Sequence, residues 1–451
     1  MGTVGINFGA ASSGQGFDVA STVTAILASQ QAIEDPWKSQ LAALQAQDTV
    51  FTTLGTDLST LTTAMQSLTD FNGVLAQKQG SSSDTNVLEL TSATAASIAG
   101  SHTISVTALA QTSSEYSDTL ANGADPLSGS LIIQGHTITV DSSSNTLASL
   151  AASINLAGIG VNASVISDVS GSRLSLVSGT SGSAGQLAIT SNLTDATTST
   201  AIGFNTGQTG MNATLNVDGV DLSSASNTVS SAIPGVTFQL LALSTAPVQV
   251  QITNDTSSVG TAVGNLVAAY NAVVNDINGQ EGKDSSGNAN PLFGSTTLAS
   301  LQNQLSSALL GGTASGSIKS VTQLGIGFNQ DGTLSLNADD LNAALNDNFA
   351  DVTGFLQNAN SFGQGFATTL NNLGAQSTRG VIYLAQQQNA AQEASLTLNI
   401  SNEDALLATE QTALTTELNT ANQILQSIPA QLNQVNEMYS AVTGYNTGNG
   451  G

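Results

Sequence analysis

Apolar residues recur every seven positions near both ends of the chain, and this spacing constrains the fold more than any other feature. In the N-terminal part, the members of the repeat are Leu44, Phe51, Leu54, Leu58, Leu61, Met65 and Leu68. They form two series three residues apart, which places one narrow apolar stripe along an α-helix. Such a stripe requires a second helix to cover it.

A similar repeat lies near the C-terminus. One series there is Ile400, Leu407, Leu414, Ala421, Ile428, Val435 and Val442, and the other is Leu418, Leu425, Leu432 and Tyr439. Each end of the chain therefore has a stripe that the other could cover, either within one subunit or between subunits. An ordinary antiparallel helical core is the alternative to a coiled coil. Pro429 predicts a kink or break near Ile428.

Local signals predict where the N-terminal helices start and stop. Asp18 is expected to cap a short helix that has apolar residues on one side. Asp35 followed by Pro36 predicts a new helix, with Asp at the N-cap and Pro in the first helical position. Asn72-Gly73 predicts the stop of this long helix.

The middle of the chain has the two-residue alternation of β-strands, from about residue 80 to residue 255. Two stretches within it resemble each other, residues 130–147 and 214–229, and each predicts a strand, a glycine turn and a return strand. Helical spacing resumes from residue 256, and further helices are expected near 297–310 and 341–356. Between these two lies a predicted hairpin that turns at Asp331-Gly332.

These patterns predict an α+β, multidomain protein with a nested order. It has terminal coiled-coil helices, a helical-bundle domain with a small hairpin, and two mainly-β domains inserted between them. The expected bounds are 1–45 with 375–451 for the terminal helices, 46–78 with 256–374 for the bundle, 79–117 with 200–255 for one β domain, and 118–199 for the inserted β domain.

Charge and cysteine content exclude several classes of protein. The chain has 6 Lys and Arg against 31 Asp and Glu, for a net charge of −25, so no basic surface is available to bind nucleic acid or an anionic membrane. It has no Cys, which excludes thiolate catalysis, cysteine-ligated metals and disulfides. Residues 1–8 lack a basic segment followed by an apolar core, so a cleaved signal peptide is not expected.

The polar residues do not form a catalytic or metal-binding pattern. Both histidines, His102 and His136, lie in β stretches and are expected to be surface residues. Two short acidic loops near residues 284–287 and 329–332 resemble calcium loops but lack the closing Glu. The two arginines, Arg173 and Arg379, are isolated in the sequence. We therefore expect no enzyme activity, no cofactor and no metal site.

Several motifs resemble those of one family, flagellar hook-associated protein 2. Gly16, Phe17 and Asp18, with Pro36 ahead of the long helix, resemble its N-terminal signature, although Leu is usual at the position of Phe17. Residues 266–278 resemble its Tyr-Asn-Ala helix, and residues 324–336 are the most specific match. Residues 131–193 resemble the flagellin-type insert of hook-associated proteins. The resemblance extends over nearly the whole chain.

This resemblance implies a structural protein that caps the distal end of the bacterial flagellar filament. It implies a secreted, extracellular protein that forms a homo-oligomeric ring, works with flagellin subunits and the filament tip, and uses an export chaperone. The terminal helices are then legs that contact the filament. The expected interface residues are the seven N-terminal stripe residues together with Leu407, Leu414, Leu418, Leu425, Ile428, Leu432 and Val435.

Two alternatives remain open at this stage. The chain could be an extracellular adhesin whose β domains bind a host or surface receptor, with residues 121–126 and 179–185 as candidate loops. It could also be a flagellin or a subunit of the hook–filament junction. The terminal signatures of those subunits are not found here, and they have no equivalent of residues 324–336.

Overall fold

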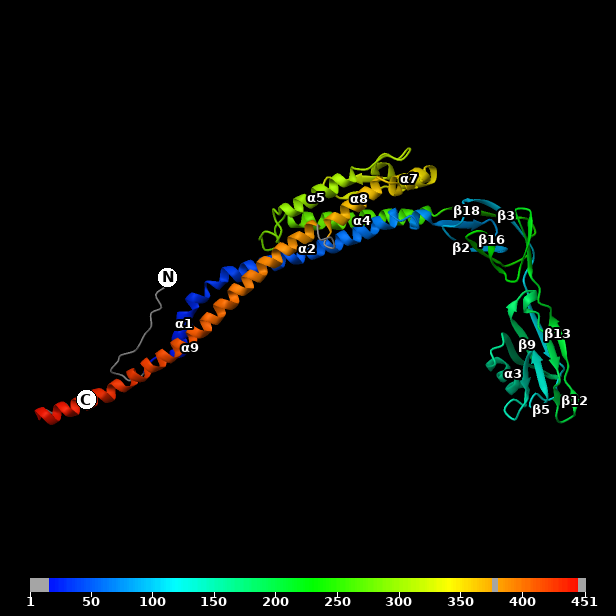
Figure 1. Ribbon diagram of the computed structural model, residues 1–451, viewed down its shortest axis with the longest axis horizontal. Coiled ribbons are helices and arrows are strands. Elements are labelled where there is room, and N and C mark those ends of the chain that lie inside the picture. The colour runs from blue at the N-terminus through cyan, green and yellow to red at the C-terminus, as the bar shows by residue number, and fades with distance from the viewer. Residues whose placement is uncertain (1–15, 375–379, 445–451) are drawn as a thin grey trace. The chain divides into compact units, whose positions relative to one another are not determined.

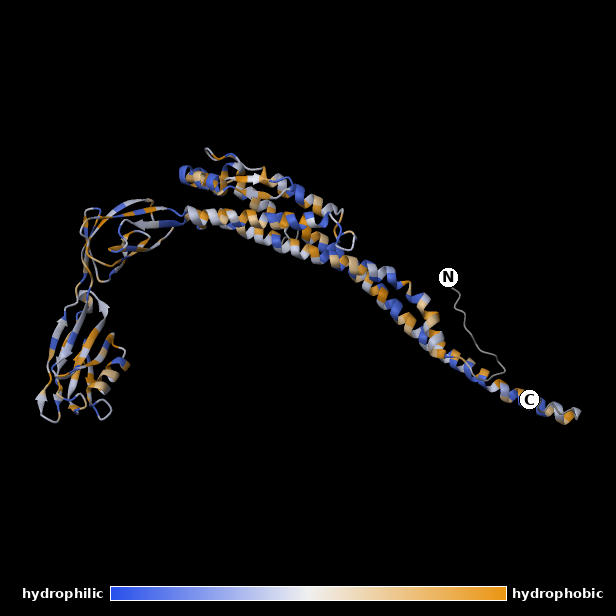
Figure 2. Cartoon of the chain, turned by 180° about the vertical axis from the view of Figure 1, so that it is seen from behind, coloured by the Kyte–Doolittle hydropathy of each residue, from blue (hydrophilic) through white to orange (hydrophobic). Residues whose placement is uncertain are grey.

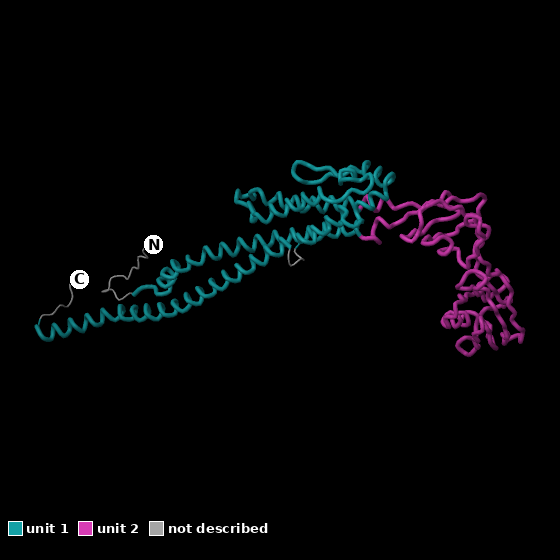
Figure 3. The backbone as a smooth tube through the Cα atoms, turned by 45° about the horizontal axis from the view of Figure 1, so that its top comes forward, with its two compact units in different colours: residues 1–69, 262–451 teal, residues 70–261 magenta. Residues whose placement is uncertain are grey.

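The computed structural model describes residues 16–374 and 380–444. The chain forms two compact units, residues 1–69 with 262–451 and residues 70–261 (Figure 3). The first unit is helical apart from one small hairpin, and the second consists mainly of strands (Figure 1). Helices and strands together confirm the predicted α+β, multidomain class.

The helices carry the apolar stripes. They are α1 (Val19–Gln31), α2 (Glu34–Thr69), α3 (Leu147–Leu156), α4 (Thr256–Gln280), α5 (Thr296–Leu309), α6 (Ala338–Asp347), α7 (Phe349–Gln357), α8 (Phe362–Leu373) and α9 (Val381–Thr443). Asp18 caps α1 as predicted, because its carboxylate accepts the backbone N–H of Ala20 at 3.0 Å and of Ser21 at 3.2 Å. These hydrogen bonds lower the pKa of Asp18, and the largest contribution comes from the backbone N–H of Ser21.

Three helix predictions were wrong in detail. The long helix α2 begins at Glu34, so Asp35 is not its cap and Pro36 is its third residue. Glu34 is buried there and pairs with Lys38 one turn further along. Pro36 is tolerated because the first N–H groups of a helix have no intrahelical partner. The helix predicted for residues 341–356 is two helices, α6 and α7, which are separated at Asn348.

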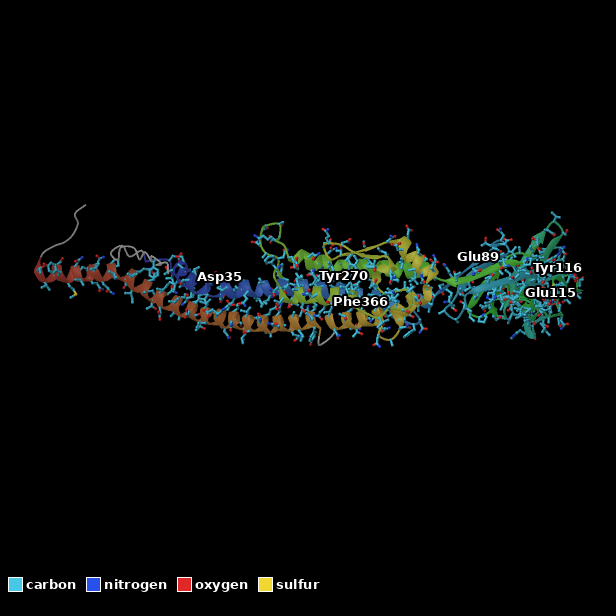
Figure 4. The ribbon with its side chains drawn as sticks, turned by 90° about the horizontal axis from the view of Figure 1, so that it is seen from above. Asp35, Glu89, Glu115, Tyr116, Tyr270 and Phe366 are labelled. Carbon is cyan, nitrogen blue, oxygen red and sulfur yellow. The ribbon has the colours of Figure 1, made fainter. Side chains whose placement is uncertain are left out.

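Pro429 does not break α9, which runs without interruption from Val381 to Thr443. Proline removes one backbone hydrogen bond, from its own nitrogen to the carbonyl of Leu425. The surrounding side chains are half-buried or exposed, so water can hydrate that carbonyl. Helix α8, in which Phe362 and Phe366 stack with ring centroids 5.6 Å apart, was not predicted. Phe366 lies inside the helical unit (Figure 4).

The β unit contains two separate hydrophobic cores. Its strands are β1 (Lys78–Ser82), β2 (Leu88–Ala93), β3 (Gly100–Ala108), β4 (Thr112–Ser117), β5 (Leu127–Ser128), β6 (Ser130–Ile133), β7 (His136–Thr139), β8 (Val161–Asp168), β9 (Gly171–Ser181), β10 (Ile189–Ser191), β11 (Thr194–Asp195), β12 (Thr200–Ala201), β13 (Phe204–Gln208), β14 (Ala213–Val217), β15 (Val220–Ser224), β16 (Thr228–Ile233), β17 (Val236–Leu240) and β18 (Val248–Asn254).

Each of the two cores has its own set of sheets. The first core lies between a five-stranded sheet, β1-β18-β3-β14-β15, and a three-stranded sheet, β16-β17-β2. The second core includes α3 and a four-stranded sheet, β13-β4-β9-β8, with two smaller sheets. Strands β4 and β13 therefore pair within the inserted part, although the expected bounds of 118 and 199 left them outside it. We propose residues 112–208 as the bounds of the insert.

The two resembling β stretches fold into equivalent hairpins. Residues 130–139 turn at Gln134 and Gly135, with φ values of 51° and 81°. Residues 213–224 turn at Asp218 and Gly219, with φ values of 50° and 90°. Positive φ at both central residues is the geometry of the two-residue turn that matches the twist of the flanking strands. The predicted internal similarity therefore has a structural basis.

The predicted small hairpin is also present in the helical unit. Its strands are β19 (Ile326–Phe328) and β20 (Leu334–Leu336), and they pair antiparallel. Gly332 has a φ of 81°, a value that L-residues with a side chain adopt only under strain. The Asp331-Gly332 turn is thus confirmed.

Candidate functional site

The N-terminal stripe forms the inner face of α2. Leu54, Leu58, Leu61, Met65 and Leu68 have no exposed surface, and Leu44 and Phe51 are 7% and 3% exposed. Helices α9, α8 and α7 of the same chain contact α2. The stripe is therefore covered within the chain.

The first part of α9 runs antiparallel to α2. The side-chain amide of Gln386 donates to the hydroxyl of Thr52 at 3.2 Å, and that of Asn389 donates to the carboxylate of Asp48 at 2.8 Å. Asn389 is only 8% exposed. This polar contact was not predicted, because the apolar repeat of α9 starts only at residue 400. The contact fixes the register of the two helices, since an apolar residue opposite Asp48 would leave its carboxylate without this donor.

Helix α1 covers the next part of α9. Val19, Val23 and Leu27 form a buried cluster with Leu407, and Phe17, Leu414 and Leu418 pack against its edge. The backbone N–H of Phe17 donates to the side-chain oxygen of Asn422 at 2.9 Å. Phe17 of the N-terminal signature thus lies directly on the C-terminal helix.

Gly16 has a specific reason to be glycine. Its φ is +65°, and a Cβ at this position would lie 2.2 Å from the side-chain oxygen of Asn422. Any other residue would therefore have both backbone strain and a steric conflict with α9. The other two signature residues have other roles: Asp18 caps α1, and Pro36 lies in the first turn of α2.

The C-terminal stripe becomes exposed toward its end. Leu407 is 6% exposed, and Leu414, Leu418, Leu425 and Ile428 are half-buried. Leu432 and Val435 are 47% and 60% exposed, so the chain does not bring them together with the other predicted interface residues. We call the uncovered apolar face of α9 the open row; its members are Ile424, Leu425, Ile428, Leu432, Val435, Met438, Tyr439 and Val442.

Two family-like motifs meet in the helical bundle. The side chain of Asn271 on α4 accepts the backbone N–H of Leu334 at 2.6 Å and donates to the carbonyl of the same residue at 2.8 Å. Asn278, two turns further along α4, donates to the carbonyl of Asp331 at 2.8 Å. The Tyr-Asn-Ala helix therefore holds the hairpin by its free backbone groups. Tyr270 is buried beside it within the helical unit (Figure 4).

A carboxyl pair joins α2 and α4. Burial raises the pKa of Asp57 to about 6, and its hydrogen bond with Asp276 adds to the increase. Two carboxyl groups this close share a proton more readily than they ionise together. No local pattern indicates this pair, because the two residues are 219 positions apart.

The remaining polar residues have structural roles. His102 lies 2.7 Å from a carboxylate oxygen of Asp218, and this contact lowers the pKa of Asp218. His136 is exposed in β7. Arg173 lies 5.9 Å from the centre of the Tyr116 ring, and Arg379 is outside the described residues. Among the residues that the structure describes, no group of three or more His, Cys, Asp or Glu is placed to hold a metal ion.

No helix in the described part of the chain is both long enough and apolar enough to span a bilayer. The long helices α2 and α9 carry polar residues at most positions outside their apolar stripes (Figure 2).

Comparison with family models decides the relationship. The model of the flagellar hook-associated protein 2 N-terminus matches residues 15–113, and the model of its C-terminus matches residues 210–443. The chain belongs to this family. The first match contains the N-terminal signature and the second contains the Asn271 contact and α9. Between the two matches lie residues 114–209, nearly the same residues as the insert defined by strand pairing.

Curated relatives and a solved structure agree with this result. The chain is 33% identical over 355 residues to the B-type flagellar hook-associated protein 2 of Pseudomonas aeruginosa, an alignment covering 70% of this chain and 74% of that protein. It is 32% identical over 360 residues to flagellar hook-associated protein 2 of Escherichia coli K12, covering 74% of this chain and 76% of the relative. The crystal structure of the D1-D2-D3 domains of the Escherichia coli flagellar cap protein superposes with a TM-score of 0.59 at 29% identity, covering 76% of this chain and 99% of that one.

Proposed function

We propose that this chain is a structural cap at the distal end of the bacterial flagellar filament. It forms an oligomeric ring that promotes the folding and insertion of exported flagellin subunits and prevents their loss. The observation that carries the proposal is the family match at both ends of the chain, together with the contact that joins those ends. A solved relative of similar fold is a flagellar cap protein.

The terminal helices are the part of the chain that fits a filament. They pair antiparallel and present a stripe that is covered near the bundle and open toward the end of α9. We infer that they act as legs at the filament tip, with the residues of the two apolar stripes as the interface. The buried part of the interface, from Leu44 to Leu68 and at Leu407, holds the helices together within the chain. The open row is available to another molecule.

The work of the cap is steric and involves no bond chemistry. Several carboxylates among the described residues are engaged in helix caps and turns, as at Asp18 and Asp331. Binding energy at the interfaces therefore has to drive each step of assembly. We accordingly propose that the protein is not an enzyme and uses no cofactor.

Two further partners belong to the proposal. An export chaperone would cover apolar surface before assembly, and the open row is such a surface. The insert would bind a receptor if the filament tip also adheres to surfaces. Deletion of residues 118–199, or of the wider 112–208, separates the two roles: capping continues if the insert serves only in adhesion.

Immunogold electron microscopy of the source cells tests the proposed function. The antibody is raised against residues 80–255, which form part of a compact unit of their own. We expect gold only at filament tips. Gold along the filament would indicate a flagellin-like subunit, and gold on cells without filaments would indicate an adhesin; either result overturns the cap proposal.

A further inference from the structure

Methionine is the side chain of this protein that a mild oxidant attacks most readily. The chain contains no Cys and four Met, so the thioether is its softest sulfur group. Exposure separates the three methionines that the structure describes: Met65 is 0% exposed, Met211 is 51% exposed and Met438 is 69% exposed. Because oxidation depends on access to the sulfur, Met438 is the most accessible of the three.

Met438 is also the one of these three methionines that lies in the open row. On α9, Val435 lies one turn before it and Val442 one turn after it, and both are exposed in the same row. Met65 lies in the covered stripe of α2, and Met211 lies between β13 and β14. A chemical change at Met438 therefore alters an apolar face that another molecule can reach.

A peroxide converts the thioether of Met438 into a sulfoxide. The sulfur lone pair attacks one peroxide oxygen, the O–O bond breaks and an S–O bond forms. The sulfur is oxidised, and the other oxygen leaves as water with both protons of the peroxide. The product has a polar oxygen, which accepts hydrogen bonds, in place of an apolar sulfur.

The apolar neighbours of Met438 in the row offer that oxygen no hydrogen bond. Val435 and Val442 have no donor in their side chains. In the free chain, water hydrates the sulfoxide because the site is exposed. Where another molecule covers the row, the oxygen loses that water, and burial of an unpaired polar group weakens the contact by about tenfold or more.

We propose that Met438 is an oxidation-sensitive site, at which a peroxide makes the open row partly polar and weakens the contact of this row with the filament tip. This inference rests on the proposed function, in which the terminal helices act as legs at the tip. The helical unit keeps its fold, because Met438 lies outside its buried core.

Peptide mass spectrometry of the peroxide-treated full chain tests the site. Trypsin cuts after Lys and Arg, which places Met65 in the peptide 39–78 and Met438 in the peptide 380–451, each without a second Met. We expect the second peptide to gain an oxygen atom well before the first, whose sulfur is buried in the folded chain. Equal rates for the two peptides would overturn the assignment.

Hydrophobic-interaction chromatography of the full chain tests the effect on the row. We expect peroxide to shorten the retention of the unmodified chain. Met438→Leu keeps an apolar side chain of similar size and should lose the greater part of this response. Met211→Leu is the matched control, because Met211 is exposed in the β unit, and it should keep the greater part. An undiminished response in Met438→Leu would contradict the proposal.

Filament growth tests the consequence in cells without any peroxide. Met438→Gln places a polar side chain with good helix propensity at the site, as a stand-in for the sulfoxide, and we expect shorter filaments. Met211→Gln, the control outside the row, should leave filament length unchanged. Filaments of normal length in Met438→Gln cells would overturn the inference.

Immunogold labelling separates this inference from the proposed function. Gold at filament tips together with normal filaments in Met438→Gln cells means that the cap proposal stands and the oxidation site fails. Gold away from the tips overturns the cap proposal, and with it the proposed effect of Met438 on the filament contact.

Discussion

The first and last parts of α9 differ in what covers their apolar residues. Between residues 386 and 418, α2 and α1 cover the helix, and polar contacts such as Asn389 with Asp48 fix the register. Between residues 424 and 442, the apolar residues of the repeat that starts at Ile400 are largely exposed. An apolar repeat therefore predicts that a helix packs against another helix. It does not predict which part of the repeat is covered, because that depends on where the other helices of the chain end.

The largest effect is expected from a charge in the covered stripe. Leu54→Asp places a carboxylate at a site with no exposed surface, and an uncompensated buried charge costs about 3 to 5 kcal/mol. We expect the helical unit to lose most of its stability and filament growth to stop, while the β unit stays folded. Thermal unfolding followed by circular dichroism, with a motility assay, measures both.

The matched control for this prediction is Leu432→Asp. Leu432 is 47% exposed in the open row, so the same charge should leave the unfolding of the monomer unchanged. Equal destabilisation by the two substitutions would show that both parts of α9 are covered alike.

A smaller effect is expected where α1 covers α9. Leu407→Ala removes a side chain that is 6% exposed and packs against α1, and we expect a loss of about 2 kcal/mol, near the lower end for buried leucine. Hydrogen exchange of the α1 amides should accelerate. Leu432→Ala removes the same atoms from the open row and should leave these amides protected; acceleration in both variants would contradict the distinction.

Part of the fold of the helical unit was predictable from the sequence and part was not. The stripe residues, the Asp18 cap and the Asp331-Gly332 turn depend on neighbouring residues, so local rules identified them. The break at Asn348 and the continuity of α9 through Pro429 were missed, because tertiary packing and hydration decided them. The contacts of Asp57 with Asp276 and of Asn389 with Asp48 join residues far apart in the chain, which no local pattern reveals.

The polar contact between Asn389 and Asp48 should contribute less than the apolar ones. Asn389→Ala removes the donor to the Asp48 carboxylate, and hydrogen bonds to charged groups contribute about 1.5 to 3 kcal/mol. Partial exposure of Asp48 places the expected loss near the lower value. Urea unfolding of the full chain measures it. Asn433→Ala, at an exposed position on the same helix, is the control and should behave like the unmodified chain; a similar loss in that variant would argue against a specific role for Asn389.

The smallest effect is a dependence on pH in the covered region. The pKa of Asp57 is raised to about 6, so the folded chain holds a proton that the unfolded chain has released between about pH 4 and pH 6. This pair therefore stabilises the fold most below pH 4, and its contribution falls as the pH rises through 6. Asp57→Asn keeps a hydrogen-bonding side chain without the ionisation, so we expect its melting temperature to exceed that of the unmodified chain at pH 7 and the difference to shrink at pH 4. A constant difference between the two chains across this range would show that Asp57 does not titrate there, and Asp84→Asn, at an exposed acid in the β unit, controls for the change in net charge.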